Sequence, residues 1–137
     1  MVAPVSTLNN MENIMNQLTQ DLPVTMEAAG TKIHNASWGD MVVGYLELPA
    51  GTDFTPLFVG LPNDACQCPH WGYVIKGAVH LRYTDGTEEV TGAGAAFYSP
   101  AGHTAWVEQD TALIDFSPEK ELKEVMAHVT QKMAQSA

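Results

Sequence analysis

The chain has 137 residues, a length that supports one compact hydrophobic core and makes two separate domains implausible. Hydrophobic residues make up 45% of the sequence and charged residues 16%, which is typical of a globular protein and excludes a disordered or fibrous chain. The formal net charge of −10 argues against binding to nucleic acid or to an anionic membrane surface.

Apolar stretches in the sequence are short. The stretch Met41–Leu48 is interrupted by Gly, Tyr and Glu, well below the roughly 20 apolar residues that a membrane-spanning helix requires. The first residues include no basic segment followed by an apolar one, so we expect no signal peptide. A cytoplasmic location is therefore the expectation.

The first predicted element is an amphipathic helix over residues 7–20. Its apolar residues recur at a spacing of three or four, at Leu8, Met11, Ile14, Met15 and Leu18. Ser6 or Thr7 is suitable as its N-cap, and the Asp-Leu-Pro segment at 21–23 would end it.

Short β-strands are predicted for the middle of the chain. Runs rich in Val, Ile, Tyr, Phe and Thr alternate there with turn residues about every eight to twelve positions, which is typical of an antiparallel sandwich or barrel. The clearest strands are residues 41–48, 71–76, 79–83, 95–99, 105–108 and 112–116. Asp85 and Gly86 between two such runs predict a β-hairpin.

A second helix is predicted at the end of the chain. Ser117, Pro118 and Glu119 supply a cap, a first-turn proline and an acidic group at the positive end of the helix dipole. Its apolar stripe comprises Leu122, Val125, Met126, Val129 and Met133. We therefore expect one domain in three parts: an N-terminal helical segment at 1–22, an all-β barrel at 23–117 and a C-terminal helix at 118–137.

The two cysteines of the chain, Cys66 and Cys68, are separated by one residue and cannot link distant parts of the chain. In a reducing compartment such thiols are available to a metal ion or to redox chemistry. His70 follows after Pro69, so the run from residue 66 to residue 70 is the first candidate site.

The turn spacing around this run resembles the first motif of the cupin superfamily, small antiparallel β-barrels or jelly rolls that often hold one metal ion. That motif reads Gly, five residues, His-x-His, three or four residues, Glu, six residues, Gly. Counting forward from Gly60 places Cys66 and Cys68 at the two histidine positions. Counting back from Gly77 places His70 at the glutamate position, with a shortened connection.

The second cupin motif reads Gly, five residues, Pro-x-Gly, two residues, His, and matches at Gly94, Pro100 and Gly102. Its histidine position is Ala105, and the nearby histidine is His103. The resemblance covers roughly residues 46–116 and is nearest to short, single-domain bacterial cupins. It implies a small-molecule ligand or substrate, and a homodimer is among its implications.

Could these residues hold one metal ion? In an extended strand, side chains two residues apart share a face, but four residues span about 13 Å, so the chain must bend at Pro69 to bring Cys66 and His70 together. Two thiolates and two imidazoles suit zinc, with another divalent transition metal as the alternative. We therefore predict a zinc site of Cys66, Cys68, His70 and His103, which is closed if His103 binds the ion and open if it does not.

Several interpretations stay open at this point. The cysteines can instead be small buried hydrophobic residues in a barrel without metal, and a reversible disulfide is a further alternative. The resemblance implies an enzyme, in which Tyr73 or His80 would assist proton transfer. Thiolate ligands favour a metal-dependent lyase, isomerase, cyclase or hydrolase over an iron oxygenase. The competing hypothesis is a binding or sensing module with a structural zinc ion or no metal.

Overall fold

The computed structural model describes residues 15–136. Within this range the chain forms nine β-strands, three short 3₁₀ helices and one α-helix. The strands are β1 (Val24–Ala28), β2 (Thr31–Trp38), β3 (Met41–Leu48), β4 (His70–Lys76), β5 (Ala78–Tyr83), β6 (Glu88–Gly92), β7 (Ala96–Ser99), β8 (His103–Trp106) and β9 (Thr111–Pro118). The helices are η1 (Thr19–Asp21), η2 (Thr55–Phe58), η3 (Pro62–Asp64) and α2 (Glu119–Ser136). No helix in the described range is long and apolar enough to cross a bilayer.

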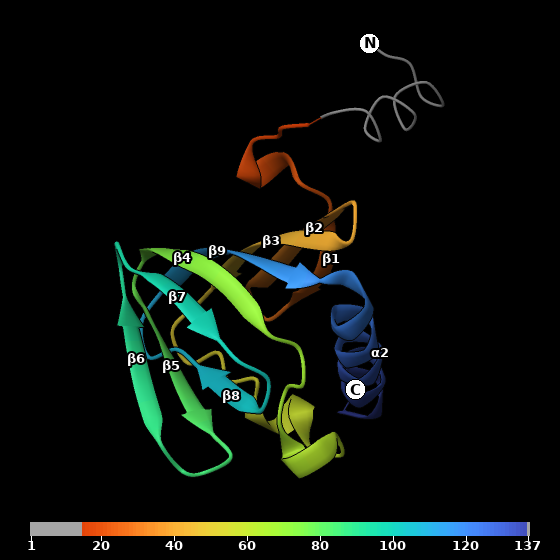
Figure 1. Ribbon diagram of the computed structural model, residues 1–137, viewed down its shortest axis with the longest axis vertical. Helices are drawn as coiled ribbons and strands as arrows, with labels where there is room; N and C mark the ends of the chain where they lie inside the picture. Colours follow the sequence, from red (N-terminus) through yellow and green to blue (C-terminus); the bar gives the residue numbers. More distant parts are fainter. Residues whose placement is uncertain (1–14, 137) are drawn as a thin grey trace.

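The strands form two antiparallel sheets, one with the order β1-β2-β3-β9-β4-β7 and one with the order β6-β5-β8 (Figure 1). One hydrophobic core joins them, in which Leu48, Val74 and Leu113 of the larger sheet pack against Val79 and Val107. Hydrogen bonding among the described residues thus gives two facing sheets rather than one continuously bonded barrel. The predicted all-β antiparallel class is confirmed.

Local sequence signals identified the middle strands well. The strand Met41–Leu48 has the predicted bounds, and the Asp85-Gly86 turn joins β5 to β6 with Arg82 opposite Glu88. Strands β1 and β2 were not predicted, and β6 was predicted only as the second strand of the Asp85-Gly86 hairpin. These strands carry several polar or charged residues, such as the Lys-x-His-Asn series in β2, which dilute the apolar alternation that marks a strand.

Most of the helix predicted over residues 7–20 lies outside the described residues. In the part that is described the prediction is wrong, because residues 15–18 have no regular structure and a single 3₁₀ turn follows at Thr19–Asp21. Met15 and Leu18 are 80% and 64% exposed, so no apolar contact supports a helix there.

The C-terminal helix is confirmed and begins at Glu119, one residue later than predicted, after a proline that still pairs with β3. Val125 and Val129 of its predicted apolar stripe are fully buried against Phe58 and the two cysteines. Figure 1 shows α2 beyond the end of β9, and together with η2 it covers one end of the space between the sheets.

Candidate metal centre and cavity

The space between the two sheets contains a cavity of about 120 Å³. Its wall is mainly apolar and includes Ile33, Leu46, Leu48, Phe54, Phe58, Val79, Leu81, Phe97, Leu113, Leu122 and Val125. Its polar residues are Asn35, Cys66, His70, Ser99, His103, Asp115 and Ser117. A concave apolar space with a few convergent polar groups is the usual form of a small-molecule site.

Strand alternation decides which side chains enter this cavity. In β4, His70 lines the cavity, whereas Trp71 and Tyr73 point outward and are nearly half exposed. In β9, Leu113, Asp115 and Ser117 all line it. The polar residues are therefore inward members of strands whose other inward residues form the core.

Cys66, His70 and His103 form the candidate metal centre. One possible ligand atom from each residue lies within 4.8 Å of the other two. The Cys66 sulfur lies 3.7 Å from His70 Nε2, and the two imidazole rings are 5.2 Å apart. The Cys66 amide donates to the carbonyl oxygen of His103 over 2.8 Å, and this bond joins the two motif segments. Residues 67–69 have no strand pairing, and β4 begins at His70.

Both imidazoles are oriented by their Nδ1 atoms. His103 Nδ1 lies 2.8 Å from the carbonyl oxygen of Pro100, and because that oxygen only accepts, Nδ1 carries the proton and leaves Nε2 as a lone-pair donor. His70 Nδ1 lies 2.7 Å from Ser117 Oγ, which leaves its Nε2 facing Cys66. Such a hydrogen bond on the second nitrogen is a regular feature of metal-binding histidines.

Burial keeps all three groups uncharged in the metal-free chain. It raises the pKa of the Cys66 thiol to about 11, and it lowers the pKa of His70 to about 3, with a contribution from His103. Burial also lowers the pKa of His103. The two imidazoles are thus neutral at physiological pH, the form that binds metal ions.

Cys68 does not join this cluster, although it was predicted as a ligand. Its sulfur lies 3.3 Å from the carbonyl oxygen of Pro69, and its side chain packs with Val125 and Val129 of α2. The prediction assumed that alternate residues of a strand share a face, but Cys68 lies outside any strand and β4 begins only at His70. Both cysteines are free thiols within the described structure.

Neither residue expected to assist proton transfer lines the cavity. Tyr73 is 46% exposed on the outer face of β4. His80 stacks on Trp106 with ring centroids 5.3 Å apart, on the outer face of the smaller sheet. Its strand neighbours Val79 and Leu81 point inward instead.

Asp115 was not predicted from the sequence, and it is the one carboxyl group among the described residues that line the cavity. Its Oδ2 lies 3.8 Å from His70 Nδ1, and burial raises its pKa to about 7. The missed signal was an acidic residue on the same strand face as Leu113, within the strand predicted at 112–116. Ser117 is two residues further along and was assigned only a helix-capping role.

Comparison with known proteins finds similarity in three dimensions alone, since neither a protein-family profile nor a curated protein sequence matches the chain. An RmlC-like cupin from Shewanella frigidimarina superposes with a TM-score of 0.56 at 18% identity, over 77% of this chain and 91% of that one. KdgF from Halomonas sp. gives a TM-score of 0.54 at 21% identity, over 74% and 92% of the two chains.

The polyketide cyclase RemF from Streptomyces resistomycificus is also similar, with a TM-score of 0.55 at 18% identity, over 77% of this chain and 80% of that one. These identities are too low to transfer an activity. The superpositions agree, however, in overall fold. The chain has the cupin fold.

Proposed function

We propose that this protein binds one divalent transition-metal ion, zinc in preference, through Cys66, His70 and His103, and that a small organic molecule occupies the adjoining cavity. The observation that carries the proposal is the convergence of three ligand atoms within 4.8 Å at the cavity wall. Both imidazoles are already neutral and held through Nδ1, so the donor set fits such an ion.

Zinc is favoured by the chemistry of the donors. One thiolate and two imidazoles match the soft and borderline ligands that zinc prefers, whereas magnesium and calcium prefer oxygen. Three protein ligands are also the number found in catalytic zinc sites, which keep one coordination position for water or substrate. When bound, the ion would supply Lewis-acid polarisation of an oxygen atom.

The chain itself supplies a group for proton transfer. Asp115 lines the same cavity as the cluster, and its raised pKa of about 7 lets it both accept and release a proton near neutral pH. This carboxyl group takes the role that the sequence analysis had given to Tyr73 or His80. Isomerisation, elimination, cyclisation and hydrolysis all need such a group, so the enzyme hypothesis gains support from Asp115.

A cysteine nucleophile is a different use of the same residues, because Cys66, His70 and Asp115 stand in the order thiol, imidazole, carboxyl. The Cys66 thiol has a pKa of about 11, however, and a neutral thiol is a poor nucleophile. The neutral state of the Cys66 thiol therefore favours a role as metal ligand over a role as catalytic nucleophile.

The mainly apolar cavity wall supports the second candidate function, a module that binds or senses a small molecule without changing it.

Metal analysis of protein purified without added zinc tests the proposal. We expect close to one ion per chain, and we expect Cys66→Ser to lose most of it. Cys68→Ser is the matched control, because it removes a thiol of the same core cluster that lies outside the three-residue group. Full metal content in Cys66→Ser, or equal losses in the two variants, would contradict the proposed ligand set. The homodimer and the cytoplasmic location stay predictions.

A further inference from the structure

Four residues lie side by side across the larger sheet, beneath the cavity. Asn35 of β2 pairs with Gly44 of β3, Gly44 pairs with Asp115 of β9, and Asp115 pairs with Gly72 of β4. Glycine therefore stands on both sides of Asp115. A Cβ atom at residue 44 would overlap Asp115 Oδ1 and would lie 3.2 Å from Asn35 Oδ1. Both side chains thus lean over Gly44 and hold their oxygen atoms above it.

These oxygens are arranged as hydrogen-bond acceptors. Asn35 Nδ2 donates to Thr25 Oγ1 over 3.0 Å, which turns Oδ1 of the amide toward Asp115. No hydrogen bond from any residue in the range 15–136 reaches the Asp115 carboxyl group, whose side chain is 14% exposed and lies 3.8 Å from the neutral imidazole of His70. A ligand in the cavity that supplies a donor would therefore find a free acceptor in this carboxyl group.

The cavity wall also limits the charge and size of the ligand. No lysine or arginine is among the described residues that line it, and the chain carries a net charge of −10. Apart from the proposed metal ion, the described wall therefore offers no cation that would offset the repulsion between Asp115 and an anionic group beside it. A cavity of about 120 Å³ is somewhat smaller than the roughly 150 Å³ engineered cavity that holds a benzene molecule. One ring or a short branched chain is the largest apolar body that fits.

We infer that the ligand of the proposed site is a small uncharged hydroxy compound, whose hydroxyl group lies over Gly44 and donates to Asp115 beside Asn35, while its apolar body fills the space lined by leucine and phenylalanine. This inference rests on the proposed function for the position of the ligand and adds its chemical class. The pair Asn35 and Asp115 then determines specificity, because it selects a donor over an acceptor or an anion.

Three probes with the same six-membered ring test the inference: cyclohexanol, cyclohexanone and cyclohexanecarboxylate. Binding is measured by calorimetry or by NMR shifts at pH 8, on metal-free protein, so that no metal ion binds the oxygen atoms of the probes. We expect cyclohexanol to bind at least about tenfold more tightly than cyclohexanone, which can only accept, and more tightly still than the carboxylate. A carboxylate or ketone that binds as tightly as the alcohol would overturn the inference.

Substitutions of Asp115 test whether this residue causes the preference for the alcohol. Asp115→Ala is expected to lower the affinity for cyclohexanol about tenfold while changing that for cyclohexanone little, so the preference for the alcohol disappears. Asp115→Asn, which keeps the shape of the side chain, is the second variant if Asp115→Ala does not fold. Asp21→Asn changes an exposed aspartate and should keep the preference. An unchanged preference in both variants of Asp115 would also overturn the inference.

Metal content is measured separately on the wild-type protein, which separates the two proposals. An alcohol preference that depends on Asp115 supports the ligand class, even if metal analysis contradicts the zinc site. Stoichiometric zinc together with no preference among the probes contradicts the ligand class and leaves the metal site intact.

Discussion

The carboxyl group of Asp115 occupies the space in which residue 44 would carry a side chain. The two residues pair across β3 and β9, and a Cβ atom at position 44 would overlap Asp115 Oδ1. Gly44→Ala should therefore lower the free energy of unfolding by about 2 kcal/mol, the usual cost of overpacking a well-filled site. Urea denaturation of the metal-free protein measures the change.

The same overlap predicts a rescue. In an Asp115→Ala background the added methyl group at position 44 has room. Gly44→Ala should therefore lower the free energy of unfolding there by less than half as much as it does in the wild-type chain. Gly92→Ala is the matched control, since Gly92 lies in strand β6 and a Cβ atom there meets nothing within 4 Å. Equal costs at position 44 with and without the Asp115 side chain would show that the carboxyl group is not the obstacle.

Much of the fold was predictable because its signals are local. The Asp85-Gly86 turn, the apolar strand Met41–Leu48 and the stripe of the C-terminal helix are each encoded within a few residues, and the structure contains all three. The motif spacing also pointed to Cys66 and His70, whereas His103 was chosen as the histidine nearest to the motif position at Ala105; the structure brings these three residues together.

The rest of the site depends on strand pairing between distant segments, which no local pattern reveals. Asp115 faces Gly44 and Gly72 only because β9 lies between β3 and β4 in that register. Cys68 shows the opposite failure: its spacing suggested a ligand, but it lies before the start of β4 and packs against α2 instead of joining the cluster. Spacing predicts which residues are near one another along the chain, whereas strand register and tertiary packing decide which of them meet.

Metal binding should release about one proton for each ion at neutral pH. The thiol of Cys66 keeps its proton until about pH 11, whereas the low pKa values of His70 and His103 leave both imidazoles neutral. An incoming ion therefore competes with one proton, and its affinity should rise about tenfold for each pH unit between about pH 6 and pH 9. Calorimetry in buffers of different ionisation enthalpy measures the released proton. An affinity that does not change with pH would exclude the thiolate as a ligand.

Ser117 should affect the metal affinity of the site although it does not bind the ion itself. Its hydroxyl oxygen lies 2.7 Å from His70 Nδ1 and fixes the orientation of that ring. Ser117→Ala should lower metal affinity about tenfold, as is usual for the loss of a hydrogen bond behind a histidine ligand. Competition with a chromogenic chelator measures the affinity. Ser37→Ala, at an exposed serine of β2, should leave it unchanged, and the same loss in both variants would point to a general effect on stability.

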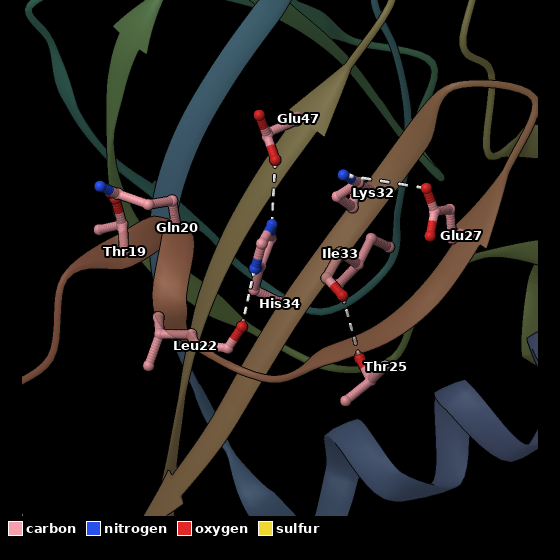
Figure 2. A network of polar contacts seen from close by, with 9 residues as sticks. All are labelled: Thr19, Gln20, Leu22, Thr25, Glu27, Lys32, Ile33, His34 and Glu47. Atoms are coloured by element: carbon pink, nitrogen blue, oxygen red, sulfur yellow. Dashed lines mark hydrogen bonds and ion pairs between the residues drawn. The ribbon is translucent and has the colours of Figure 1, made fainter. Parts of the chain in front are cut away.

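His34 holds the segment that precedes β1 against the outer face of the larger sheet. Figure 2 shows its ring between the carbonyl oxygen of Leu22 and the carboxylate of Glu47, with Nδ1 at 2.9 Å from the first and Nε2 at 3.0 Å from the second. Both partners are acceptors, so both bonds form only when each ring nitrogen carries a proton. Glu47→Ala leaves one nitrogen without its partner.

We expect Glu47→Ala to lower the free energy of unfolding by about 1 kcal/mol, a modest value because the carboxylate is 44% exposed. Cleavage of the chain near residue 22 by a protease should become faster, because the anchored imidazole, together with the hydrogen bond from the Asn35 amide to the carbonyl oxygen of Pro23, ties this segment to β2. Figure 2 also supplies the control, the ion pair of Glu27 with Lys32, whose atoms are 3.9 Å apart and mostly exposed. Glu27→Ala should change stability by less than about 0.5 kcal/mol and leave the cleavage rate as it is. If the two variants behave alike, the attachment of the segment does not depend on His34.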